Sequence, residues 1–110
     1  MIEDRLEQMQ TAIEQSPKIS GDTKAELLAL VAGLRAEIKT LSETHHEEAS
    51  SITRFADASA YEAARSRQNP QLAETALSGL RGSIQGFEDS HPRLVETVNR
   101  FATALSNMGL

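Results

Sequence analysis

The chain has 110 residues, no cysteine and a formal net charge of −5 at pH 7. This length allows one domain, the lack of cysteine excludes disulfides and thiolate sites, and the acidic balance argues against a nucleic-acid partner, which normally requires a basic surface. Tryptophan is absent and glycine and proline are scarce, so the composition favours an all-α fold.

We expect a cytoplasmic protein without a membrane partner. The first residues lack the basic and apolar segments of a signal peptide, and no apolar run approaches the length of a transmembrane helix. No phosphate-binding loop, nucleophile elbow or zinc-ligand spacing occurs either. The run Asp89-Ser90-His91 has the residue types of a hydrolytic triad, but adjacent residues cannot easily converge on one reacting atom. We therefore predict neither an enzyme nor a bound cofactor.

The first predicted helix covers about residues 2–15. Its apolar residues recur at steps of three and four, which places them on one face of a helix: Ile2, Leu6, Met9 and Ile13. Ser16-Pro17 then disfavours further helix. The stretch 16–22 is interpreted as a loop because it contains both proline and glycine.

A long second helix is predicted over residues 23–66, beginning with a capping box in which Glu26 returns to the Thr23 amide. Its seam keeps one phase throughout: Leu27, Val31, Leu34, Ile38, Leu41, His45, Glu48, Ile52, Phe55 and Ser59. Serine and threonine weaken the helix propensity near 42–51, so a bend or break there is the alternative. We prefer one continuous helix, because a loop would usually destroy the phase.

The third predicted helix covers residues 70–89, with Asn69 as its N-cap and Pro70 at its first position. Three glycines lie on the side away from its apolar stripe: Gly79, Gly82 and Gly86. They indicate either a tolerated weak helix or a flat face for close contact with another chain.

Pro92 requires a kink or break, because it lacks an amide hydrogen and pushes His91 out of helical geometry. The last helix is predicted over residues 92–107, with Gly109 as its stop signal. A heptad-type seam runs through both of these helices: Leu77, Leu80, Ile84, Phe87, His91, Leu94, Val98, Phe101, Leu105 and Met108.

The turn before Pro70 predicts that the two long segments pair as an antiparallel helical hairpin with coiled-coil-like packing. If the pairing is centred near Asn69, the polar positions His45 and Glu48 of one seam lie level with His91 of the other. The two interruptions of the seams would then meet at one level of the hairpin.

The first helix is too short to cover the whole hairpin, so its turn end would be a two-helix stalk. Such a stalk cannot shield its apolar seam from water, and we therefore predict a homodimer that forms a four-helix bundle. The predicted self-association residues are Ile52, Phe55, Leu77, Leu80, Ile84 and Phe87.

The polar level has two interpretations. His45, Glu48 and His91 could bind a metal ion, because helical bundles build such sites from glutamate and histidine. The pattern Glu-x-x-His of the di-iron bundles is reversed here, however, and occurs once. A buried polar layer that fixes helix register is the alternative, and we expect no metal.

The C-terminal residues resemble a family of short bacterial proteins. The segments F-E-D-S-H-P-R-L, Phe87 to Leu94, and A-L-S-N-M-G-L, Ala104 to Leu110, are similar to the ending of the family catalogued as domain of unknown function forty-four-zero-four. That resemblance implies a bacterial, helical, cytoplasmic protein. It brings no activity, ligand or site residues with it.

The sequence thus predicts one all-α domain over residues 1–110, a short helix followed by a long hairpin that is kinked or broken at Pro92. The predicted function is a non-catalytic structural or protein-interaction module that self-associates through its helical seams. The alternatives are a metal-binding bundle and a small helical chaperone or adaptor with an unidentified protein partner.

Overall fold

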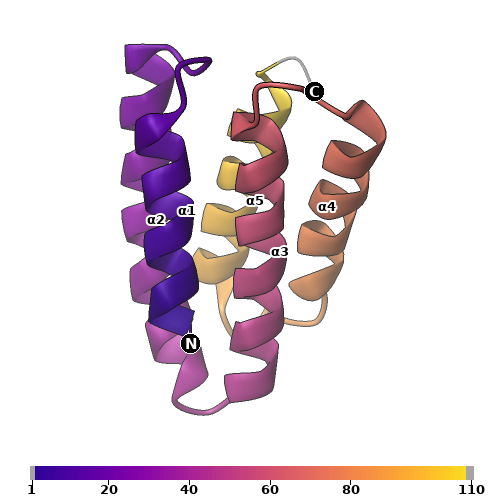
Figure 1. Ribbon diagram of the computed structural model, residues 1–110. Helices are drawn as coiled ribbons and strands as arrows, with labels where there is room; N and C mark the ends of the chain where they lie inside the picture. Colours follow the sequence, from indigo (N-terminus) through magenta and orange to yellow (C-terminus); the bar gives the residue numbers. More distant parts are fainter. Residues whose placement is uncertain (1, 109–110) are drawn as a thin grey trace.

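A computed structural model describes residues 2–108, and this part of the chain is helical without strands, which confirms the all-α prediction. Successive helices run antiparallel (Figure 1), and the molecule measures 37 × 23 × 22 Å. Gly109, predicted as a stop signal, lies outside the described residues. The helices are α1 (Ile2–Gln15), α2 (Gly21–Ser42), α3 (His46–Ala64), α4 (Pro70–Ser83) and α5 (Pro92–Ser106).

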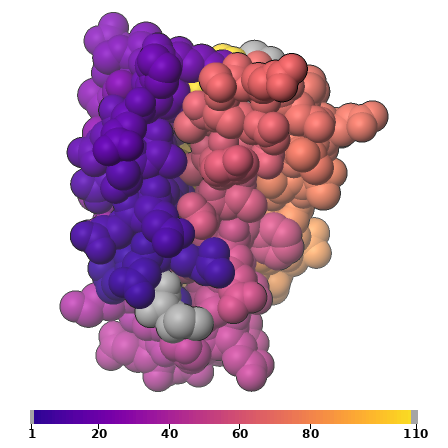
Figure 2. Space-filling view, in the orientation of Figure 1, coloured from indigo at the N-terminus to yellow at the C-terminus, as the bar shows by residue number. Residues whose placement is uncertain are grey.

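Helix α3 is the centre of the fold, because it packs against all four other helices. Helices α1 and α4 take opposite sides of α3, and α5 packs against α2 (Figure 1). On the face drawn in Figure 2, the side chains of α1 lie directly against those of α3. Side chains from all five helices form one apolar core, whose largest fully buried members include Phe101, Met9, Leu34, Leu80 and Leu94.

Two helix starts follow from side-chain capping. The Ser20 hydroxyl accepts a hydrogen bond from the Thr23 amide (3.3 Å), so α2 begins at Gly21, slightly before the predicted start. Asn69 Oδ1 accepts from the Leu72 amide (3.2 Å), and Pro70 opens α4 as predicted. In both cases the cap satisfies an amide that has no partner within the helix.

The prediction of one continuous helix over residues 23–66 is wrong. Helix α2 ends at Ser42 and α3 begins at His46, after a break of only three residues. The hydroxyl groups of Ser42 and Thr44 donate to carbonyls of the last turn of α2, Lys39 O (2.7 Å) and Leu41 O (3.4 Å). A straight helix over 23–66 would extend for about 65 Å, far beyond the longest dimension of the molecule, 37 Å.

The predicted helix over residues 70–89 also ends early, at Ser83. Gly86 has a φ of 95°, a conformation that a helix cannot contain, and its amide donates to the Glu88 carboxylate (2.9 Å). The chain then breaks before Pro92, where a kink or break is predicted, and α5 follows the predicted range closely. A glycine in the left-handed region and a proline therefore fix the second break.

The two breaks fold the predicted hairpin in half. Helix α2 pairs with α5 and α3 pairs with α4, as in the long hairpin, but the α3–α4 half turns back onto the α2–α5 half (Figure 1). Each half thereby covers the apolar seam of the other. A two-helix stalk does not exist in this fold, so the physical reason to expect a dimer is gone; dimerisation itself stays a prediction.

Candidate functional site

The predicted polar level exists, and it lies where both breaks meet. His45 is the residue before α3, and His91 is the residue before α5. Their ring centroids are 5.9 Å apart with the ring planes at 83°, an edge-to-face contact. His45 and His91 are therefore neighbours, as the register of the seams predicts, but the continuous second helix from which that register was derived does not exist and Glu48 does not join them.

Phe87 completes this cluster, which we call the three-ring cluster (His45, Phe87, His91). The centroid of Phe87 lies 5.6 Å from that of His45 and 5.5 Å from that of His91, again edge to face. Phe87 and His91 are half-buried, whereas His45 is exposed. The cluster thus closes the end of the bundle at which the α2–α3 and α4–α5 turns lie side by side.

Each histidine is held by the residue that precedes it. Thr44 Oγ1 lies 2.7 Å from Nδ1 of His45, and Ser90 Oγ lies 2.9 Å from Nδ1 of His91. Since an imidazole nitrogen can donate or accept, the tautomer decides the direction of each hydrogen bond. These bonds occupy Nδ1 of both rings and orient the imidazoles toward each other and toward Phe87.

The structure does not assemble the metal site considered above. Glu48 is exposed in the first turn of α3, and it does not join His45 and His91 as a third ligand. Within residues 2–108 no group of three histidine, aspartate or glutamate side chains is placed to hold a metal ion. The three-ring cluster packs the α2–α3 turn against the α4–α5 turn.

The predicted self-association residues fall into two groups. Four of them are buried inside the single chain: Ile52, Leu77, Leu80 and Ile84. Phe87 is half-buried in the three-ring cluster, and Phe55 remains 40% exposed. Four alanines of α3 lie at spacings that would permit close helix approach: Ala56, Ala60, Ala63 and Ala64. The first three are buried and Ala64 is partly buried.

Sequence reasoning missed an internal repeat that the structure makes plain. The segment 31–56 aligns without a gap on the segment 77–102, at the spacing that separates His45 from His91. Similar residues fill many further positions, such as Thr44 and Ser90. The identical pairs are Gly33/Gly79, Leu34/Leu80, Arg35/Arg81, Ile38/Ile84, His45/His91, Arg54/Arg100, Phe55/Phe101 and Ala56/Ala102.

The backbone repeats along with the sequence. His45 has φ −133° and ψ 64°, and His91 has φ −136° and ψ 62°. Each histidine amide donates to the carbonyl four residues before it, Leu41 O or Phe87 O, at 2.8 Å in both cases. The α2–α3 hairpin and the α4–α5 hairpin are therefore two versions of one unit, and a comparison of the chain with itself would have found them.

No family model, curated protein or solved structure matches this chain, so the comparisons with known proteins do not assign it to a family. The resemblance carried by Phe87 to Leu94 stays a prediction. Among the described helices, none combines the length and the apolar character needed to cross a bilayer.

Proposed function

We propose that the protein is a non-catalytic helical interaction module that associates with a second copy of itself. One observation carries the proposal: two equivalent hairpins, α2–α3 and α4–α5, pack on each other with the equivalent residues His45 and His91 in contact. When two like units pair about a two-fold axis, a residue near the axis contacts its own equivalent in the other unit.

The pairing between the hairpins uses repeated residues. Helix α2 packs on α5 and helix α3 packs on α4, and these two pairs become equivalent when the hairpins are exchanged. A hairpin from a second chain presents the same kind of surface as the hairpin within the chain. At low protein concentration each hairpin pairs with the other hairpin of its own chain, because the linker keeps the two close together. As the concentration rises, a second chain competes for this pairing.

The buried polar side chains support a structural role. Within residues 2–108 these are Ser16, Thr53 and Ser59. Their hydroxyl groups donate to the backbone carbonyls of Ala64 (3.0 Å), Ala49 (2.8 Å) and Phe55 (2.7 Å), respectively. Two of these bonds lie within α3, and the Ser16 bond ties the end of α1 to the end of α3. The Ser16 bond thus fixes α1 against α3, and the other two satisfy hydroxyl groups buried along α3.

Sedimentation equilibrium between about 10 µM and 1 mM tests the self-association, since complexes in this range have binding free energies of roughly 4 to 7 kcal/mol. We expect a dimer whose fraction grows with concentration. Refolding from denaturant at about 1 mM should give more dimer than refolding at about 10 µM followed by concentration, because unfolded chains choose their partner hairpin during folding. A monomer in every sample contradicts self-association.

A further inference from the structure

We propose that the second copy associates by exchange of the arm α1–α2. In the exchanged dimer residues 43–45 straighten, α2 and α3 become one helix, and the arm of each chain packs on α3–α5 of the other. This inference rests on the proposed self-association and specifies that the exchanged unit is the arm α1–α2 and not a whole hairpin. The exchanged chains would re-form the helix contacts of the closed monomer, so the free-energy difference lies in the break, in the contacts of the His45 ring and in the entropy lost on association.

The break between α2 and α3 departs little from a helix. Glu43 keeps helical angles, φ −66° and ψ −30°, whereas His45 has φ −133° and ψ 64°. Backbone bonds of the helical type already run from the His45 amide to Leu41 O (2.8 Å) and from the Ala49 amide to His45 O (2.9 Å). Straightening would add the bonds from amides 46–48 to carbonyls 42–44. The amides of Glu43 and Thr44, which donate to Thr40 O (3.3 Å) and Leu41 O (3.1 Å) in the closed form, would each move to the carbonyl one residue earlier.

The sequence around this break is compatible with a continuous helix. No glycine or proline occurs between Leu34 and Asn69. The seam also keeps its phase across the break, so a straight helix would present the residues around Leu41 and Ile52 on one face. The unbroken phase is the property on which the prediction of one long helix is based; that prediction is wrong for the closed monomer, and the proposed exchanged form would contain such a helix.

The second break cannot act as the hinge. It contains Gly86 with a φ of 95°, and Pro92 follows it at the start of α5. Proline inside a helix removes a hydrogen bond and clashes with the preceding turn. The two repeats differ at both of these points: the equivalents of Gly86 and Pro92 in the first repeat are Thr40 and His46.

Little holds the first break closed. Within the described chain, His45 makes no capping hydrogen bond with its side chain, in contrast to Ser20 and Asn69 at the starts of α2 and α4. Residues 43–48 are all exposed. The His45 ring makes edge-to-face contacts with Phe87 and His91 across this turn, and we call the three-ring cluster its latch.

Cysteine pairs can distinguish exchange from side-by-side association, since the natural chain has no cysteine. Ser16 Oγ lies 3.0 Å from Ala64 O, so Ser16→Cys with Ala64→Cys places one thiol on α1 and one on α3. A bifunctional maleimide would join them within one chain in the closed monomer and between two chains in the exchanged dimer. Arg5→Cys with Asp57→Cys, whose natural side chains lie 3.5 Å apart, is a second pair in case the first fails to fold.

We expect the dimer fraction to give covalent dimers on a denaturing gel and the monomer fraction to give covalent monomers. A dimer fraction that yields only covalent monomers overturns exchange, while the proposed self-association stands. The absence of any dimer, in the natural chain and in the hinge variants below, overturns both.

Two hinge variants shift the equilibrium in opposite directions. His46→Pro copies Pro92 of the second repeat; it fits the first position of α3 in the closed form but not the interior of a straight helix. It should lower the exchanged fraction at least about a hundredfold. Thr44→Ala with His45→Ala favours helix and removes the latch, so it should raise that fraction. Equal dimer fractions in the two variants contradict residues 43–45 as the hinge.

Discussion

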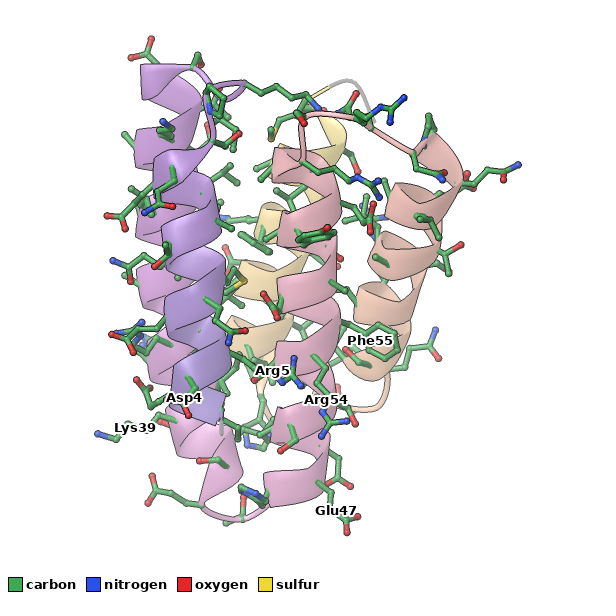
Figure 3. The ribbon with its side chains drawn as sticks, viewed as in Figure 1. Asp4, Arg5, Lys39, Glu47, Arg54 and Phe55 are labelled. Carbon is green, nitrogen blue, oxygen red and sulfur yellow. The ribbon has the colours of Figure 1, made fainter. Side chains whose placement is uncertain are left out.

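At the scale of single residues, Asp57 is the carboxyl group most affected by the fold. It lies on α3 with its side chain 20% exposed, and Asp57 Oδ2 is 3.5 Å from the Arg5 guanidinium of α1. Burial raises the pKa of Asp57 above its usual value, and the Arg5 guanidinium offsets only part of that rise. Figure 3 shows Arg5 reaching from α1 toward α3 at this level.

Asp57→Asn should therefore stabilise the protein at neutral pH. When folding raises the pKa of a carboxyl group, the protonated group contributes fully to the free energy of unfolding at a pH below the unfolded pKa. This contribution is lost as the pH rises through the folded pKa. The asparagine cannot ionise, so the variant keeps that stability, with a gain below about 1 kcal/mol because the group is paired and near the surface. Thermal unfolding of both proteins between about pH 3 and pH 7 measures the difference.

The gain of Asp57→Asn over the natural protein should be near zero at the acid end and reach a plateau at neutral pH. Glu96→Gln is the matched control, because it removes an exposed ion pair with Arg100 (2.8 Å) and should change the stability at pH 7 by less than about 0.5 kcal/mol. Lower stability of Asp57→Asn at pH 7 would show that the ion pair with Arg5 outweighs the cost of burial.

At the scale of elements, two glycines of α4 have different surroundings. A Cβ at Gly79 would overlap the ring of Phe55, which leans from α3 toward α4 (Figure 3). A Cβ at Gly82 would meet no atom of the described residues within 4 Å. The glycines therefore do not form one flat face: Gly79 makes room for Phe55, and Gly82 is a tolerated weak point of the helix.

Gly82→Ala should stabilise the protein by about 0.5 to 1 kcal/mol, because alanine loses less backbone entropy than glycine in a helix. Gly79→Ala should gain less or destabilise, since the added methyl group must displace the Phe55 ring. Urea unfolding of the two variants gives both free energies. Equal gains at the two positions would show that the half-exposed ring moves away without cost.

The spacing of apolar residues predicts where helices lie but not where a long helix breaks. The start of α4 was predicted correctly because Asn69 and Pro70 act locally. Helix α2 begins two residues before its predicted start, because Ser20 caps it in place of the predicted capping box of Thr23 and Glu26. The break at residues 43–45 has only a weak signal, the serines and threonines near 42–51, and the apolar phase is the same in a straight and in a folded chain. What decides it is a gain of the whole chain: the α3–α4 half buries its seam against the α2–α5 half.

At the scale of the molecule, only part of the candidate site was predicted, because the spacing of apolar residues does not show where the chain folds back. The meeting of His45 with His91 follows from hairpin register, which survives the folding in half. Phe87 was assigned to an intermolecular surface, because the sequence alone does not show that its seam finds a partner within the chain. The radius of gyration, 12.8 Å, is about that of a compact domain of this length.

One pair of equivalent residues in the two hairpins differs in burial, and substitutions at these two positions should therefore cost different free energies of unfolding. Phe55 and Phe101 are equivalent residues, yet Phe101 is fully buried while Phe55 is 40% exposed beside Gly79. Phe101→Ala should cost about 3 to 5 kcal/mol, the range for a large aromatic side chain removed from a core. Phe55→Ala should cost only about 1 to 2 kcal/mol, because its ring keeps much of its contact with water.

Urea unfolding at a concentration where the protein is monomeric compares these two variants without a contribution from exchange. Since a domain of this kind is stable by roughly 5 to 15 kcal/mol, Phe101→Ala should leave a folded fraction sensitive to mild heating, whereas Phe55→Ala should unfold almost like the natural protein. Similar losses at the two positions would mean that the repeat is symmetric in energy as well as in sequence. The fold as described requires the asymmetry, because Phe101 is fully buried in the core while Phe55 is 40% exposed beside Gly79.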